Sequence, residues 1–100
     1  MIGHYAAQFE REQGCTEAEW LRWLPGAVRG HALHLGPAGT ARIDIEAGGL
    51  LIRWQVLPPR QIALVRMARM AVSFRFDDVD EDARQRFMRY FDLYMQRGGG

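Results

Sequence analysis

The sequence predicts an α+β domain, with one or two N-terminal helices, a four-stranded, mostly antiparallel meander sheet and a C-terminal amphipathic helix that packs on the sheet. Three patterns predict this class: a helix-capping signal at residues 16–19, alternation of apolar and charged residues at 41–47, and helical spacing of apolar residues at 80–97. The chain of 100 residues is long enough for one domain. We place this domain at residues 1–97 and expect residues 98–100 to be a flexible glycine tail.

The composition is that of an ordinary folded protein, with 48% hydrophobic residues and a net charge of +1. This charge gives no strong attraction to nucleic acid or to an anionic membrane. All the basic residues are arginine, which we attribute to the codon usage of a GC-rich genome rather than to phosphate binding. The chain has no apolar run of about 20 residues and no signal-peptide pattern, and Cys15 has no disulfide partner, so we expect a cytoplasmic protein.

Residues 2–13 are predicted to form a short N-terminal helix. Tyr5 and Phe9 are four residues apart and would lie on one face of it, with charged residues on the other. Gly14 is expected to end this helix.

A second helix is predicted to begin after Thr16. Thr16 and Glu19 have the spacing of a capping box, in which each side chain accepts a hydrogen bond from the other residue's backbone N–H. The helix carries Trp20 and Trp23 on a wide apolar face and is expected to end at Pro25.

The clearest strand lies at residues 41–47 and follows a shorter one at 31–35. Gly48-Gly49 fits a two-residue hairpin turn, because glycine adopts a positive φ without steric cost. This turn predicts pairs on the apolar side between Ala47 and Leu50, Ile45 and Ile52, Ile43 and Trp54, and Ala41 and Val56, and on the polar side between Asp44 and Arg53 and between Arg42 and Gln55.

The segment after this hairpin has two interpretations. Pro58-Pro59-Arg60 is predicted to make the next turn, because proline cannot donate to a sheet ladder. A strand over residues 62–76 would span roughly 50 Å at about 3.3 Å per residue, which is too long for a domain of this size. We therefore predict a bend or bulge at residues 66–69, after which the strand pairs with residues 31–35. The alternative is a helix at residues 59–71, where good helix formers are frequent.

The C-terminal helix has signals at both ends. Asp80 can cap its first turn, where Glu81 and Asp82 also favour the positive end of the helix dipole, and Gly98 is expected to follow its last residue. Its apolar face consists of Ala83, Phe87, Phe91 and Tyr94.

No residues have the spacing of a catalytic, metal or nucleotide site. His31 and His34 would point to opposite faces of a strand and could not share a metal ion. Cys15 lacks an identifiable base that would activate it. The acidic residues at 77–82 lack the spacing of a calcium loop, and helix capping accounts for them. We therefore predict no catalytic residue, no metal and no cofactor.

The strongest functional candidate is the outward face of the predicted sheet, which would carry apolar side chains among arginines. Met and Arg are enriched at protein interfaces, so this face favours a non-catalytic accessory domain that binds a protein or forms a homodimer. In a second interpretation, the helix with Trp20 and Trp23 covers this face. The candidate surface consists of Leu51, Arg53, Leu57, Val65, Met67 and Arg69, and the predicted register places Leu51 near Met67.

Two other functions are open. A cleft between the sheet and the C-terminal helix could bind a small molecule or anion, with or without catalysis, and Arg66 would contact its carboxylate or phosphate. The outward face could instead bind single-stranded nucleic acid, although the near-neutral charge argues against it. The arginines for that function are Arg42, Arg53, Arg69 and Arg75.

Overall fold

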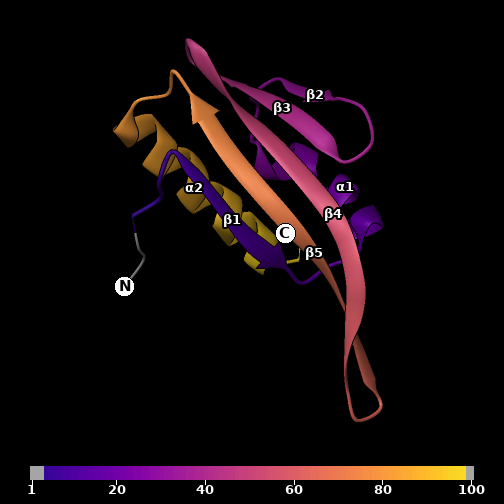
Figure 1. The fold of residues 1–100 in the computed structure, drawn as a ribbon. Coiled ribbons are helices and arrows are strands. Elements are labelled where there is room, and N and C mark those ends of the chain that lie inside the picture. The colour runs from indigo at the N-terminus through magenta and orange to yellow at the C-terminus, as the bar shows by residue number, and fades with distance from the viewer. Residues whose placement is uncertain (1–3, 99–100) are drawn as a thin grey trace.

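The computed structural model describes residues 4–98 and confirms the α+β class, with a sheet of five strands instead of four (Figure 1). The sheet is antiparallel and its strands lie in the order β1-β5-β4-β3-β2, so the first strand pairs with the last. In chain order the elements are β1 (Gln8–Gln13), α1 (Glu17–Ala27), β2 (Leu33–Leu35), β3 (Thr40–Ile45), β4 (Gly48–Ile62), β5 (Val65–Asp77) and α2 (Glu81–Gln96).

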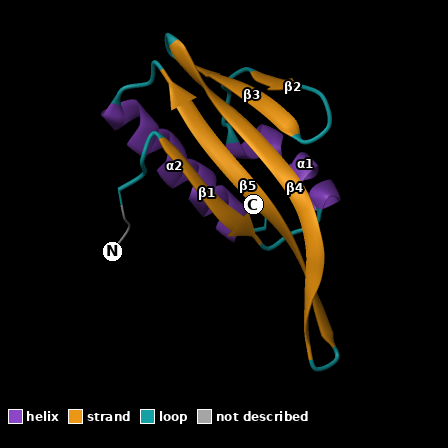
Figure 2. Ribbon diagram, viewed as in Figure 1, coloured by secondary structure: helices purple, strands orange, loops and turns teal. Residues whose placement is uncertain are grey.

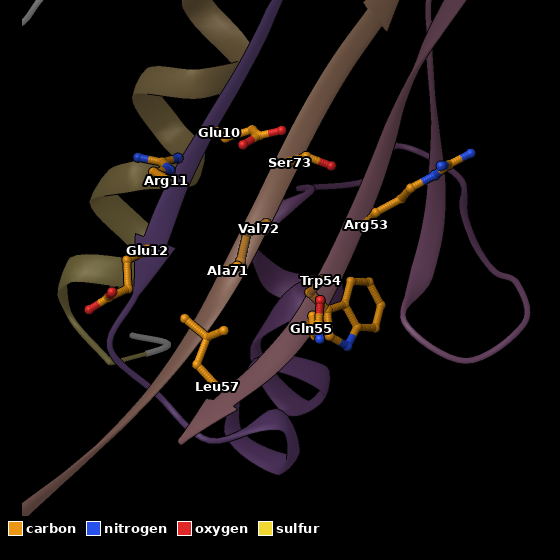
Figure 3. Close-up of a pocket in the computed structure, with 10 residues that line it drawn as sticks. All are labelled: Glu10, Arg11, Glu12, Arg53, Trp54, Gln55, Leu57, Ala71, Val72 and Ser73. Carbon is orange, nitrogen blue, oxygen red and sulfur yellow. The ribbon is translucent and has the colours of Figure 1, made fainter. Parts of the chain in front are cut away.

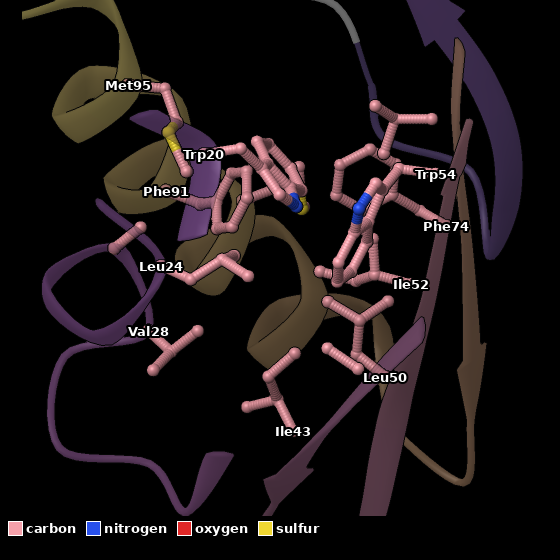
Figure 4. Packing of buried hydrophobic residues seen from close by; sticks show 14 of the residues in the cluster. Trp20, Leu24, Val28, Ile43, Leu50, Ile52, Trp54, Phe74, Phe91 and Met95 are labelled. Carbon is pink, nitrogen blue, oxygen red and sulfur yellow. The ribbon is translucent and has the colours of Figure 1, made fainter. Parts of the chain in front are cut away.

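Both helices pack on the same face of the sheet (Figure 2). Trp20 of α1 is fully buried, and its ring meets Trp54 of β4 and Phe91 of α2 edge-on, with centroids 5.8 and 5.9 Å apart (Figure 4). The interpretation in which α1 covers the second face is therefore wrong. The strands supply alternate residues to this core, namely Ile43, Ile45, Leu50, Ile52, Trp54, Met70, Val72, Phe74 and Phe76.

The N-terminal helix predicted at residues 2–13 is wrong where the structure describes it, because residues 8–13 form β1. A spacing of four is even, so Tyr5 and Phe9 fit the period of a strand as well as that of a helix. Phe9 points into the core and stacks on Phe74, with ring centroids 4.8 Å apart. Residues 1–3 lie outside the described part of the chain.

Side-chain hydrogen bonds join α2 to β1 and to Tyr5, which precedes this strand; among them, the Arg84 Nε donates to the carbonyl oxygen of Tyr5 at 2.9 Å. Arg11 donates two hydrogen bonds to the Asp92 carboxylate, at 2.6 and 3.1 Å, and the Tyr5 hydroxyl donates a third at 2.5 Å. The buried Gln85 side chain bonds both the N–H and the C=O of Tyr5. The first strand and the last helix are thus fixed to each other by charge-assisted hydrogen bonds, which are stronger than neutral ones.

The hairpin of β3 and β4 is present, but its predicted turn and register are wrong. The turn consists of Glu46 and Ala47, with Glu46 at φ +52°, and Ile43 pairs with Leu50 instead of Trp54. This difference of four residues is even, so every side chain keeps its predicted face.

The two glycines have a different role from the predicted one. A Cβ atom on Gly48 would collide with the backbone carbonyl oxygens of Asp77 and Asp78, and one on Gly49 would lie 2.6 Å from Arg42. Gly48 therefore permits the close approach of β5 rather than the turn, whereas the nearest atoms to Gly49 belong to the movable end of the Arg42 side chain.

The turn predicted at Pro58-Pro59-Arg60 is also wrong, because β4 continues through both prolines to Ile62. The register shifts there, from Leu57 opposite Arg69 to Arg60 opposite Met67, so the prolines occupy a bulge. The Arg69 Nε donates a 2.8 Å hydrogen bond to the carbonyl oxygen of Pro58. The chain turns later, at Ala63, which has φ +54°.

Strand β5 is continuous, so the alternative helix at 59–71 is wrong. The bulge predicted at residues 66–69 is present at this level of the ladder, but it lies in β4, opposite Met67 and Arg69, and β5 itself does not bend away. It pairs with β4 and β1, whereas β2 pairs with β3 at the opposite edge instead of with the second half of β5. The expectation that a strand of this length is too long for the domain was wrong, because it assumed that the whole strand packs against the core. Instead, the ends of β4 and β5 project beyond both helices as a two-stranded ribbon, which we name the arm (residues 56–69; Figure 1).

Both helices begin as predicted. Thr16 and Glu19 form the reciprocal capping box, and the Asp80 side chain accepts from the N–H of Ala83. Helix α1 contains Pro25 and ends two residues beyond it, whereas α2 ends at Gln96 with Gly98 at φ +65°, as predicted. Residues 99 and 100 of the expected flexible tail lie outside the described residues.

The register of the hairpin predicts the effect of two glycine substitutions. Gly48→Ala places a methyl group against backbone oxygens that cannot rotate away, so the free energy of unfolding should fall by about 1–3 kcal/mol in urea denaturation. Gly14→Ala is the control, because nothing lies within 4 Å of its Cβ position and its φ is not positive. Equal effects of the two substitutions would contradict the close approach of β5 to Gly48.

The Tyr5 contact predicts a loss of stability in alkali. Burial, then the hydrogen bond to Asp92 and its charge, raise the Tyr5 pKa from 10.0 to about 12. Folding thus favours the neutral phenol, and this contribution is complete below pH 10 and disappears as the pH rises to 12. Across that window, the free energy of unfolding should fall more steeply in the natural protein than in Tyr5→Phe. Parallel curves would contradict the contact, since every other titrating group is common to both proteins.

Candidate functional site

The face of the sheet that turns away from both helices carries a groove of about 540 Å³, and we name this side the open face (Figure 3). Small side chains of β5, which lies between β1 and β4, form its floor, namely Ala71 and Ser73. On the β1 side stand Glu10, opposite Ser73, and Glu12, opposite Ala71. On the β4 side Arg53 is opposite Ser73. The groove therefore has a carboxylate wall, a basic wall and a small, weakly polar floor.

The arm adjoins one end of this groove, at Leu57. Five of the eight exposed large hydrophobic residues among residues 4–98 belong to the arm, and Leu64 at its tip is 96% exposed. Residues 47–76 contain no aspartate or glutamate, so the arm carries only positive charges. The exposed hydrophobic residues of the arm are Val56, Ile62, Leu64, Val65 and Met67.

The base of the arm is fixed to β1 by Glu12. Its carboxylate accepts a 3.0 Å hydrogen bond from Arg69 and lies 3.4 Å from the Arg60 guanidinium. Because Arg69 also bonds the carbonyl of Pro58, it connects both sides of the bulge to β1. Arg69, predicted as part of the interaction surface, therefore stabilises the base of the arm.

The predicted surface residues share one side of the β4–β5 ladder but do not form one patch. Leu51 pairs with Arg75, whereas Met67 pairs with Arg60. Eight residues of β5 separate these two positions, about 26 Å of extended chain. The predicted proximity of Leu51 and Met67 is thus wrong, because it followed from the wrong register. The remaining members of the predicted surface divide between the two regions, with Arg53 near Leu51 and with Leu57, Val65 and Arg69 in the arm.

Arg66 also lies on the arm, opposite Gln61, and is exposed. It does not line the space between the sheet and α2, where it was predicted. The pocket at that place is lined instead by Arg29 and Arg86, which sequence reasoning missed. Arg29 could not be recognised, because the helix was predicted to end at Pro25, whereas it continues to Ala27 and places Arg29 directly after its C-cap Val28.

The histidines and Cys15 lie apart from one another. His31 is bonded to the carbonyl oxygen of Val28, and His34 donates to Asp44 at 2.9 Å, which with the charges of His34 and Arg42 lowers the pKa of Asp44. Cys15 is buried, and burial followed by the charge of Glu19 raises its pKa to about 11. This thiol is protonated at neutral pH, which disfavours nucleophilic attack. Among residues 4–98, no three His, Cys, Asp or Glu side chains lie close enough to hold a metal ion.

The arginines considered for nucleic-acid binding are mostly paired. Arg42 lies 3.6 Å from Asp44, Arg75 lies 3.4 Å from Asp77, and Arg69 is bonded to Glu12. The aromatic side chains of β4 and β5 point into the core, away from these arginines. The open face thus lacks the exposed aromatic platform on which single-stranded nucleic acid stacks.

Comparison of the chain with protein-family models, with curated proteins and with solved structures gave no match. Within the described residues, neither helix is long and apolar enough to cross a membrane.

Proposed function

We propose that this chain is a non-catalytic accessory domain that forms a homodimer through the arm. The observation that carries the proposal is the concentration of exposed hydrophobic residues on the arm, beyond the reach of either helix. Contiguous apolar surface on a folded protein is typical of an interaction site, because its burial contributes about 25 cal/mol per Å². The buried free thiol of Cys15 agrees with a reducing cytoplasmic location.

Because side chains alternate along a strand, several apolar residues of the arm point to the same side of the ladder. Ile62 pairs with Val65, and Met67 pairs with Arg60, so these residues belong to the side of the ladder that continues as the open face. An occupant of the open face therefore meets the groove and the apolar side of the arm together.

Charge favours a second copy of the chain as this occupant. The arm carries no acidic residue, and Arg60 and Arg69 at its base already face Glu12 of the same chain, so the complementary groups left for a second copy are Arg66 of the arm and Glu10 of the groove. In a two-fold dimer each partner presents the same patch, so both arms can lie in both grooves at once. The groove floor has small side chains that leave room for Met67 and its neighbours.

Nucleic acid is a weaker candidate for the same surface. The arm has five exposed hydrophobic residues, whereas Arg60 and Arg69 already face Glu12. Affinity for nucleic acid grows with the number of phosphates that are neutralised, and this surface offers few unpaired charges.

The dimer is tested by Met67→Asp. Met67 is 51% exposed and makes no contribution to the core, so the substitution should leave the urea unfolding curve unchanged. It places a carboxylate in the apolar contact, so the variant should remain monomeric in light scattering at concentrations where the natural protein is dimeric.

Leu35→Asp is the matched control, since Leu35 is also a strand residue, is 60% exposed and lies on the distant strand β2. It should dimerise like the natural protein. A natural protein that is monomeric from micromolar to millimolar concentration overturns the proposal, as does a dimer that Met67→Asp does not weaken. Binding of the monomer to a DNA oligonucleotide, lost in Arg66→Glu, would assign the arm to nucleic acid instead.

A further inference from the structure

A second cavity, of about 310 Å³, lies at the opposite end of β4 from the arm. It is formed where the turn between β3 and β4, the end of α1 and the first turns of α2 meet. Its polar residues include Arg29, His31, Arg86 and Tyr90, and its apolar wall includes the Phe87 ring. The volume is at the lower end of the range for small-molecule sites.

Arg29 occupies a backbone position that disfavours it. It follows the C-cap Val28 with φ +49°, a left-handed conformation in which glycine is usual after a helix. Its guanidinium lies over the Tyr90 ring, 4.5 Å from the centroid. The chain thus has a positively charged side chain beside the cavity at a backbone position where glycine would be more stable. Strained positions of this kind are frequent at functional sites.

His31 has one free polar atom. Its Nδ1 lies 2.7 Å from the carbonyl oxygen of Val28, and a carbonyl can only accept, so Nδ1 carries the hydrogen. The ring is edge-on to Phe87, with centroids 5.4 Å apart, which fixes its orientation. In the neutral imidazole, the hydrogen on Nδ1 leaves Nε2 as an acceptor, so His31 lines the cavity but is not one of the groups that pair with a carboxylate.

The charges around the cavity favour an anion. Among its lining residues Glu46 is the single carboxylate, and it lies 3.6 Å from Arg86. Both side chains are more than 60% exposed, so this ion pair is weak and a ligand carboxylate can replace Glu46. The carboxyl end of α1 adds negative potential nearby, which opposes the two arginines and disfavours a doubly charged phosphate more than a single carboxylate.

We infer that this cavity binds a small monocarboxylate with an apolar body, such as an aromatic acid. Arg29 and Arg86 pair with the carboxylate, while Phe87 and its apolar neighbours contact the body of the ligand. This site is independent of the proposed dimer, since it shares no residue with the arm or the groove.

The test is a titration of the ¹⁵N-labelled protein with benzoate, followed by amide chemical shifts, with benzamide as the neutral ligand of the same shape. Benzoate should bind with a dissociation constant of about 1 mM, given its few heavy atoms, and shift the amides of Arg29, His31 and Phe87. Benzamide should bind at least about tenfold more weakly, because it cannot form the charge-assisted hydrogen bonds.

Arg29→Gly is the decisive variant, because glycine suits the left-handed φ and the melting temperature should be equal or higher. Its affinity for benzoate should fall about tenfold or more. Arg97→Gln removes an equal charge at the far end of α2 and should leave the affinity unchanged. The inference is overturned if benzoate does not saturate, if benzamide or inorganic phosphate binds as tightly, or if Arg29→Gly binds as the natural protein does.

Discussion

The β4–β5 ladder is longer than either helix, and this difference in length determines where the core ends and the arm begins. Helix α2 has 16 residues and spans about 24 Å at 1.5 Å per residue. Strand β4 has 15 residues and spans about 50 Å at 3.3 Å per residue. The helices can therefore cover one half of the ladder, where the core forms. The other half projects with its apolar side chains exposed, and this mismatch creates the arm.

The core half has to be rigid for the arm to be presented in one direction. Aromatic contacts around Trp20 supply the packing, and the hydrogen bonds from Arg11 to Asp92 join the first strand to the last helix. Strand β1 then transmits this rigidity, because Glu12 at its end bonds Arg69 at the base of the arm. The bulge at Pro58 lies at the same level, so the arm begins where the contacts with β1 end.

Much of the fold could be predicted because local chemistry determined it. The capping residues Thr16 and Asp80 specified both helix starts, and alternation specified which side of each strand is buried. Strand β1 could not be recognised, since the spacing of Tyr5 and Phe9 fits two periods. The predicted hairpin register was wrong because Gly48 is required by a tertiary contact, the close approach of β5, that no local pattern reveals. The residues of the candidate surface were predicted on the correct face of the sheet, but their positions along it were wrong, because Leu51 and Met67 lie far apart in the true register.

In the proposed dimer the arm of one copy lies in the groove of another, and intermolecular paramagnetic relaxation can detect this contact. A nitroxide attached to Leu64→Cys, in an unlabelled copy, is mixed with the ¹⁵N-labelled natural protein; buried Cys15 leaves the new thiol as the accessible one. In this dimer the amide signals of Glu10, Ala71 and Ser73 should broaden, while those of α2 should not. Broadening confined to other surfaces, or no broadening at a concentration that gives dimers, would contradict it.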